Sequence, residues 1–141
     1  MIVLKTQQFN SILRHGESDY PFECCGLLFG HFEGERKIIE EIFPISNARE
    51  EESKRNRFLI TPDEFSRGEQ RAGGNGLDVV GFYHSHPDHP ARPSQFDLEH
   101  AWPVYSYIIV SIMQGKAALL LSWELLDDRS GFKTEKMMKG E

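Results

Sequence analysis

The chain has 141 residues, of which 39% are hydrophobic and 27% are charged, and its formal net charge is −6 at pH 7. A chain of this length predicts one globular domain over residues 1–141, large enough to bury a core of its own. The acidic balance disfavours nucleic-acid binding, because proteins that bind phosphates usually carry a basic patch.

Hydrophobic periodicity and turn residues predict an alternation of strands and helices. In chain order, we expect a strand at 1–5, a helix at 6–20, a hairpin of strands at 24–32 and 37–45, a short strand at 58–60, a helix at 61–72, a strand at 77–86, a helix at 94–101, a hairpin of strands at 104–112 and 117–126, and an edge strand at 132–137. These elements predict an α/β (α+β) fold in which a mixed, largely antiparallel β-sheet packs against two or three helices.

Capping residues mark where the helices begin. Thr6 is a candidate N-cap of the first helix. Thr61 and Glu64 form a capping box at the second helix, with Pro62 at its first helical position. Ser94 takes the cap position of the third.

A charged loop, Asn47–Arg57, separates two of these elements and contains no apolar anchor. It predicts a solvated connection, since burying it would gain little free energy. A flap that orders over a substrate is the alternative.

The two cysteines, Cys24 and Cys25, are adjacent, so a disulfide between them would be strained. A chain without disulfides suits a reducing compartment. The first ten residues do not resemble a signal peptide, and no stretch approaches the roughly 18 apolar residues of a membrane helix. We therefore expect a cytoplasmic protein without a membrane partner.

The stretch "HSHPDHPARPSQFD", from His84 to Asp97, joins the end of an apolar strand to the start of a helix. Side chains at i and i+2 of a strand point to the same face, so His84 and His86 project together. Asp97 lies one turn into the helix, where it can supply a third ligand. Two imidazoles and a carboxylate suit zinc, and three protein ligands leave a fourth position open, as in catalytic zinc sites.

Each half of this pattern has a simpler interpretation on its own. A His-x-His pair at a strand end is usually accidental, as short motifs often are. Ser94 and Asp97 alone are typical of a helix cap with an acid in the first turn. The two halves at this spacing are much harder to obtain by chance.

Together with "PFECCGLLFG", which places Glu23 before a Cys-Gly-Leu strand, this pattern resembles the signature of the JAMM (MPN-plus, Mov34/MPN/PAD-1) metalloproteases. The resemblance implies the cytidine-deaminase-like MPN fold and one zinc ion per chain. It implies that His84, His86 and Asp97 bind the zinc. Glu23 would shuttle a proton from the zinc-bound water, and Ser94 would stabilise the tetrahedral intermediate.

The short chain is most similar to the compact, stand-alone prokaryotic members of this family, of the type that cleaves a cysteine from a sulfur-carrier protein. That similarity implies a partner: a ubiquitin-like β-grasp sulfur carrier whose C-terminal Gly-Gly precedes the cleaved bond. Two alternatives stay open, an isopeptidase that removes such modifiers from protein lysines and a non-catalytic MPN scaffold. The sequence leaves the oligomeric state open.

Other residues that could carry chemistry have simpler interpretations. We expect His89 and His100 to lie at the surface, and Cys24, Cys25, Trp102 and Trp123 to lie in the core.

Overall fold

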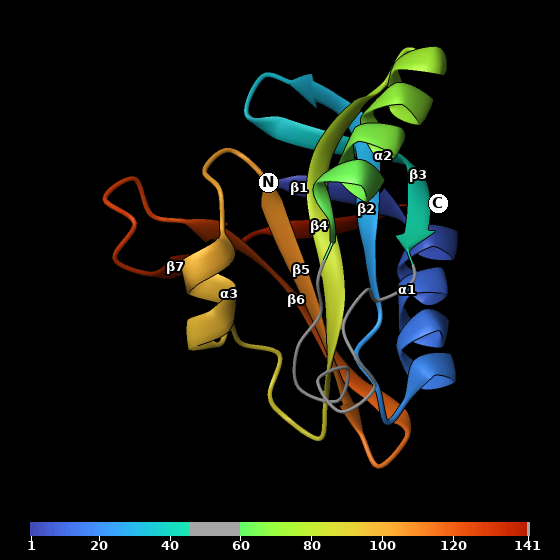
Figure 1. Cartoon of the computed structure of the whole chain (residues 1–141), viewed down its shortest axis with the longest axis vertical. Coiled ribbons are helices and arrows are strands. Elements are labelled where there is room, and N and C mark those ends of the chain that lie inside the picture. The colour runs from blue at the N-terminus through green and yellow to red at the C-terminus, as the bar shows by residue number, and fades with distance from the viewer. Residues whose placement is uncertain (46–59, 141) are drawn as a thin grey trace.

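A computed structural model describes residues 1–45 and 60–140, which form eight strands and three helices (Figure 1). In chain order these are β1 (Ile2–Lys5), α1 (Thr6–Asp19), β2 (Cys25–Glu33), β3 (Arg36–Ile45), α2 (Pro62–Gly74), β4 (Asp78–Pro87), α3 (Gln95–His100), β5 (Ser106–Met113), β6 (Lys116–Leu125), β7 (Phe132–Glu135) and β8 (Met137–Gly140). Within these two ranges, no helix is both long enough and apolar enough to cross a membrane.

The strands form one sheet in the order β7-β6-β5-β4-β2-β3-β1-β8. Four neighbouring pairs are antiparallel: β7 with β6, β6 with β5, β4 with β2, and β2 with β3. Three pairs are parallel: β4 with β5, β1 with β3, and β1 with β8. The predicted mixed sheet with three helices is therefore confirmed.

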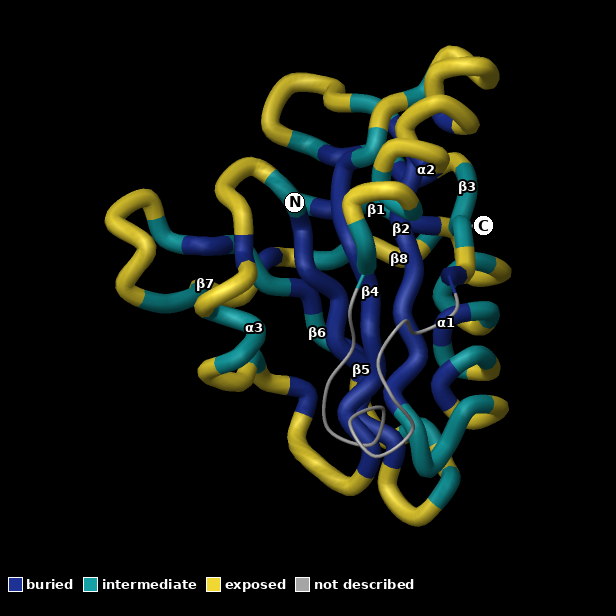
Figure 2. Tube along the Cα trace, viewed as in Figure 1, coloured by how far each residue is buried: buried dark blue, intermediate teal, exposed yellow. Residues whose placement is uncertain are grey.

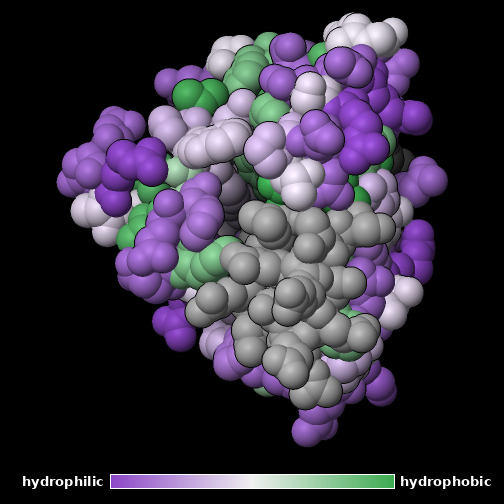
Figure 3. Space-filling view, viewed as in Figure 1, coloured by the Kyte–Doolittle hydropathy of each residue, from purple (hydrophilic) through white to green (hydrophobic). Residues whose placement is uncertain are grey.

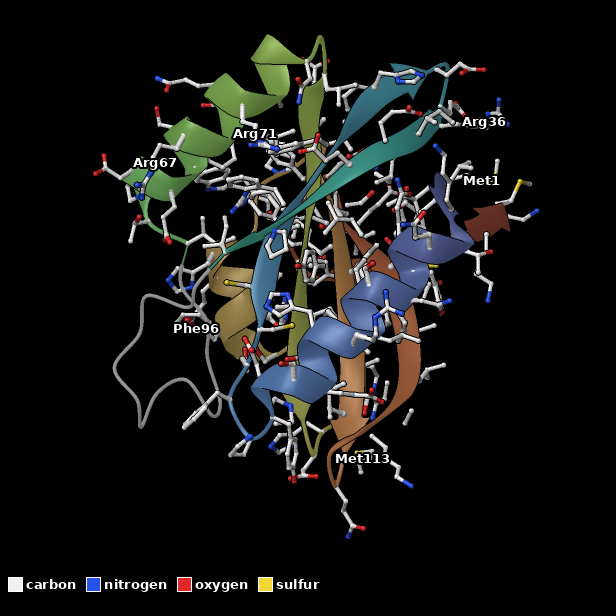
Figure 4. The ribbon with its side chains drawn as sticks, turned by 90° about the vertical axis from the view of Figure 1, so that its right-hand side faces the viewer. Met1, Arg36, Arg67, Arg71, Phe96 and Met113 are labelled. Carbon is white, nitrogen blue, oxygen red and sulfur yellow. The ribbon has the colours of Figure 1, made fainter. Side chains whose placement is uncertain are left out.

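The central strands are buried along most of their length because helices cover both faces of the sheet (Figure 2). Helix α1 lies across one face, and α2 and α3 lie on the other (Figures 1 and 4). Successive side chains of β2 point to opposite faces of the sheet. Leu28 packs in one core with Ile12 of α1, whereas Leu27 and Phe29 pack in the other core with Ala72 of α2.

The predicted capping box of α2 and the predicted cap of α3 at Ser94 are confirmed. The Thr61 hydroxyl accepts the Glu64 N–H at 3.1 Å, and the Ser94 hydroxyl accepts the Asp97 N–H at 3.1 Å. The cap predicted at Thr6 is wrong, because Lys5 is the N-cap of α1. The Thr6 hydroxyl instead donates to the Gly140 carbonyl at 2.7 Å, a contact between distant parts of the chain that local pattern cannot predict.

The single edge strand predicted at 132–137 is also wrong, because this stretch belongs to two strands at opposite ends of the strand order. Strand β7 pairs with β6, and β8 pairs with β1, with only Lys136 between β7 and β8. The sheet therefore curls until its two ends meet.

Two of the sequence expectations fall partly or wholly outside the residues described. The charged loop Asn47–Arg57 lies entirely outside them. The short strand predicted at 58–60 lies partly outside them. Its last residue, Ile60, is described and is not in a strand.

A buried ionic cluster joins the curled ends of the sheet. Lys37 Nζ of β3 donates to Glu124 Oε2 of β6 at 2.9 Å and to Glu135 Oε2 of β7 at 3.2 Å. The hydroxyls of Ser106 and Ser122 donate to Glu135 Oε1 at 2.6 and 2.9 Å. Lys37 and Glu135 are only 5% and 1% exposed, and the Met1 ammonium lies 3.4 Å from Glu135 Oε2. Removing either Lys37 or Glu135 therefore leaves a buried charge with fewer partners.

We expect Lys37→Met to lower the free energy of unfolding by about 3 kcal/mol, because the buried Glu135 then keeps only the more distant N-terminal ammonium of Met1, 3.4 Å away, as a cation. Urea denaturation of Lys37→Met, Glu135→Gln and the double variant would measure this. The double variant should lose less than the two single losses added together. Additive losses would show that the two charges do not support each other.

Candidate metal centre

Strand β4 presents His84 and His86 on the face of the sheet that carries α2 and α3. His84 pairs with Cys25 of β2 on one side and with Ile109 of β5 on the other, so the backbone at this position is held by two ladders. The two histidines are 1% and 7% exposed. The predicted same-face pair is therefore present, with Ser85 on the opposite face.

Helix α3 brings Asp97 against these two rings. Asp97 Oδ2 lies 3.3 Å from His84 Nε2 and 3.2 Å from His86 Nε2, and the two Nε2 atoms are 3.1 Å apart. The same oxygen accepts the Ser94 N–H at 2.8 Å, which completes the helix cap. The Asp97 carboxylate thus caps the N-terminus of α3 and completes a triad of potential ligands.

The surroundings favour the charge states that a metal requires. Burial lowers the pKa of His84, although the Asp97 carboxylate opposes this shift. Burial by itself raises the pKa of Asp97, but His84, the hydrogen bonds with both rings and the Ser94 N–H together lower it well below its usual range. A neutral imidazole and an ionised carboxylate are the forms that bind metal ions.

A hydrogen bond fixes the tautomer of His86. Its Nδ1 lies 3.0 Å from the Pro90 carbonyl, which can only accept, so Nδ1 carries a proton, and in the neutral ring Nε2 presents a lone pair to the triad. With a neutral His86 ring, two acceptor atoms, His86 Nε2 and Asp97 Oδ2, lie 3.2 Å apart, an arrangement that a shared cation stabilises. The donor set of His84, His86 and Asp97 fits a metal ion on these grounds.

The proline-rich loop between β4 and α3 is held by side chains from the sheet. Its prolines have no N–H groups, so the loop is anchored through its carbonyl oxygens. Three consecutive carbonyls accept side-chain donors: His89 from Ser111 at 2.6 Å, Pro90 from His86 at 3.0 Å, and Ala91 from Trp123 at 3.0 Å. Sequence reasoning missed the roles of Ser111 and Trp123, because nothing in the local pattern marks them.

Glu23 is 3% exposed and lies just before β2. The Cys24 N–H donates to Ser85 Oγ at 2.8 Å, and the Ser85 N–H donates to the Cys24 carbonyl at 3.1 Å. Ser85 faces away from the triad. It thereby fixes the segment that carries Glu23 against β4, the strand of His84 and His86, which we call the histidine strand.

A cavity of about 480 Å³ brings the remaining predicted site residues together. It is lined by Glu23, His86, His89, Pro90, Arg92, Pro93 and Ser94. Glu23 and Ser94, which are far apart in sequence, thus face the same space beside His86.

An apolar groove of about 430 Å³ approaches the triad from the side of α2 and α3, and reaches both His84 and Asp97. Aromatic side chains dominate its lining: Phe65, Phe82, Phe96, Trp102, Tyr107 and Phe132. Figure 3 shows hydrophobic surface on this face of the molecule, and Figure 4 shows Phe96 at α3. The groove gives an extended chain an apolar path to the candidate metal centre.

Trp102 lies in this groove, and its prediction as a core residue is wrong. It is 50% exposed and follows α3 in an irregular segment, where its backbone N–H donates to the Tyr107 hydroxyl at 2.7 Å. Its ring packs edge-on against Phe65 with centroids 5.6 Å apart.

The other candidates behave as expected. His89 and His100 are exposed, and His100 Nδ1 bonds to the Phe96 carbonyl at 2.9 Å. Cys24 and Cys25 are buried, and burial raises the pKa of Cys24 to about 12, so it is no thiolate near neutral pH.

Comparisons with known proteins place this geometry in a family. Residues 5–126 match the family model of prokaryotic homologs of the JAB domain. Desampylase of Haloferax volcanii is 36% identical over 107 residues, covering 72% of this chain and 74% of that protein. CysO-cysteine peptidase of Mycobacterium tuberculosis is 28% identical over 128 residues, covering 90% and 84%. A probable TtuB-protein conjugate cleaving protease of Thermus thermophilus is 32% identical over 101 residues, covering 71% and 63%.

Solved structures share the fold. Protein DSY2949 of Desulfitobacterium hafniense has a TM-score of 0.87 at 31% identity, covering 100% of this chain and 94% of that one. AF2198 of Archaeoglobus fulgidus, a JAB1/MPN domain protein, has a TM-score of 0.61 at 20% identity, covering 100% and 98%. The second likeness bears on the fold alone, and it confirms the predicted MPN fold.

We expect the purified protein to bind one divalent metal ion per chain, and His84→Ala to lose it, because one of three ligands is removed. Elemental analysis would measure this, with His89→Ala, an exposed histidine of the loop that follows β4, as the control. Circular dichroism of the metal-free protein should still show the folded state, since the core does not depend on the triad. Equal metal content in wild type and His84→Ala would refute the assignment.

Proposed function

Because the chain belongs to the family of prokaryotic homologues of the JAB domain, we propose that it is a zinc metallopeptidase. Its proposed reaction is hydrolysis of the amide bond after the C-terminal Gly-Gly of a ubiquitin-like sulfur-carrier protein. The observation that carries this proposal is the convergence of His84, His86 and Asp97 beside a cavity that Glu23 and Ser94 share.

Zinc is the metal that this donor set suits best. Two imidazole nitrogens and one carboxylate oxygen are typical of catalytic zinc sites, in which a fourth position stays open. When bound, zinc supplies Lewis acidity, which makes water a nucleophile near neutral pH and polarises the scissile carbonyl. The protein's own groups then handle the protons.

Glu23 is the proposed general base. Its carboxylate accepts a proton from the attacking water and later gives that proton to the departing amine, so the bond breaks without a covalent enzyme intermediate. This role needs a fixed carboxylate next to the triad. The two hydrogen bonds between Cys24 and Ser85 support that requirement.

Ser94 is the proposed donor to the oxyanion. Its Oγ accepts the Asp97 N–H at 3.1 Å, so its own hydroxyl hydrogen remains to be donated elsewhere. Ser94 also lines the cavity that Glu23 shares. A hydroxyl aimed at the developing negative charge stabilises the transition state.

The shape of the site supports an extended substrate tail. Glycines pass close to a metal because they carry no side chain, and an apolar residue upstream of them could occupy the aromatic groove. Glycine also loses the most backbone freedom on binding, so the folded carrier must supply binding energy through its own surface.

The names of the relatives support a ubiquitin-like partner. One is a CysO-cysteine peptidase, which supports release of a small group from a carrier. The likeness to a probable TtuB-protein conjugate cleaving protease favours a second candidate, an isopeptidase that releases a ubiquitin-like modifier from protein lysines. The same site would serve both reactions. A non-catalytic scaffold is disfavoured, because all five predicted site residues are present and grouped.

Glu23→Gln should keep the metal and the fold but lower kcat at least about 100-fold, because an amide cannot accept the water's proton. Steady-state kinetics and elemental analysis on the same preparation would test this. Glu40→Gln, an exposed glutamate on β3, is the control and should retain full activity. Near-normal turnover by Glu23→Gln would exclude it as the base.

We expect the zinc-loaded protein to cut ubiquitin-like carriers immediately after their terminal Gly-Gly. Intact-mass analysis of carriers extended by one cysteine, and of carriers joined to a lysine side chain, would separate the two candidate reactions. Replacing the last glycine by valine should abolish cleavage. A short peptide with the same tail should be cut far more slowly than the whole carrier. Equal rates for peptide and carrier would indicate a general peptidase.

A further inference from the structure

Asp88 follows the histidine strand directly and adopts a left-handed backbone conformation with φ 58°. Its N–H donates to the Ile112 carbonyl of β5 at 2.6 Å. Asp and Asn enter this region more readily than most residues, but it is still uncommon for them. The conformation turns the Asp88 side chain toward two other segments of the chain.

The Asp88 carboxylate accepts one hydrogen bond from each of these segments. Oδ2 accepts the Tyr20 hydroxyl at 2.6 Å, and Oδ1 accepts the Gln114 N–H in the β5–β6 turn at 2.8 Å. The Tyr20 ring also lies over that turn, since a Cβ added at Gly115 would be 3.8 Å from it. The Asp88 side chain thus connects the end of α1 with the histidine strand and with the β5–β6 turn.

Tyr20 is the C-cap of α1 and lies three residues before Glu23. Asp88 lies two residues after His86. The Tyr20–Asp88 bond therefore links the segment that carries the proposed base with the strand that carries two of the proposed ligands. Because Asp88 is exposed, its hydrogen bonds compete with water. They therefore contribute little to stability, and their main effect is to fix the position of Tyr20.

Other contacts also hold the chain at the end of α1. The Tyr20 N–H donates to the Gly16 carbonyl at 3.2 Å, and the Phe22 N–H donates to the Asp19 carbonyl at 2.8 Å. His15 Nδ1 lies 2.7 Å from the Tyr83 hydroxyl and fixes the helix one turn before Tyr20. Ser85 fixes the chain after Glu23 through Cys24. The stretch from Tyr20 to Cys24 lies between these anchors, and Asp88 adds a side-chain contact at its start.

We propose that Asp88 is a positioning residue, which acts through Tyr20 to hold Glu23 at the distance from the triad that proton transfer requires. This inference rests on the proposed function of Glu23. Small displacements of a catalytic group cost large factors in rate, so loosening this link should lower kcat by about tenfold and leave KM unchanged.

A double-variant cycle tests the proposal. Tyr20→Phe removes only the hydroxyl, and Asp88→Gly removes the carboxylate while permitting the left-handed backbone. Each should lower kcat by about tenfold with normal metal content, and the double variant should be no worse than the poorer single variant. Asp128→Ala is the control, because Asp128 accepts similar bonds from Ser130 N and Oγ at 2.9 and 2.6 Å in the turn between β6 and β7. It should behave as wild type.

Hydrogen exchange provides a readout that does not require activity. The Cys24 amide should exchange faster in Tyr20→Phe and in Asp88→Gly than in wild type and Asp128→Ala. Losses of kcat that add in the double variant, an effect on KM alone, or unchanged exchange would overturn the role of Asp88. If wild type cleaves no carrier, the proposed function fails, and exchange alone decides whether Asp88 holds the Glu23 segment.

Discussion

The antiparallel register of β2 against β4 is the constraint on which the site depends. Cys25 pairs with His84, which places Glu23, two residues before Cys25, beside the end of the histidine strand. A slip by one residue would turn His84 and His86 to the opposite face of the sheet, away from α3. The hydrophobic pattern prevents this slip, because the same slip would turn Phe82 and Tyr83 away from their separate cores.

Groups at the site serve structure and proposed chemistry at once. The Asp97 carboxylate accepts the first free N–H of α3 and also contacts both imidazoles. Ser94 caps the same helix and lines the cavity next to Glu23. Helix α3 is short, but the Ser94–Asp97 cap at its N-terminus holds Asp97 in a fixed orientation toward the two histidines.

The grouping of the candidate site residues was largely predictable from sequence, because most of them follow local rules. The i and i+2 spacing of His84 and His86 and the cap spacing of Ser94 and Asp97 each depend on one element. The capping box at Thr61 was predictable for the same reason. Glu23 needed the family resemblance, since only the pairing of two distant strands brings it to the histidines.

The misassigned residues are those whose environment comes from distant parts of the chain. Thr6 bonds to Gly140 instead of capping its helix, and Trp102 is exposed because the groove beside α3 is open. The stretch 132–137 has the pattern of one strand, but curling of the sheet divides it between two partners. Ser111, whose hydroxyl donates to the His89 carbonyl, belongs to no recognisable sequence motif, so its role is visible only in the folded structure.

The pairing of β1 with β8 has a consequence for how the chain reaches this structure. Residues 2–5 align with residues 137–140, so a parallel ladder closes a loop of more than 130 residues. Closing so large a loop costs much chain entropy before any contact repays it, and contacts this distant in sequence slow folding. On the ribosome, the pairing of β1 with β8 must wait until β8 is synthesised, while the hairpin of β2 and β3 and its pairing with β1 can form early. Strand β4 and the candidate metal ligands on it can therefore assemble before the curled sheet is closed.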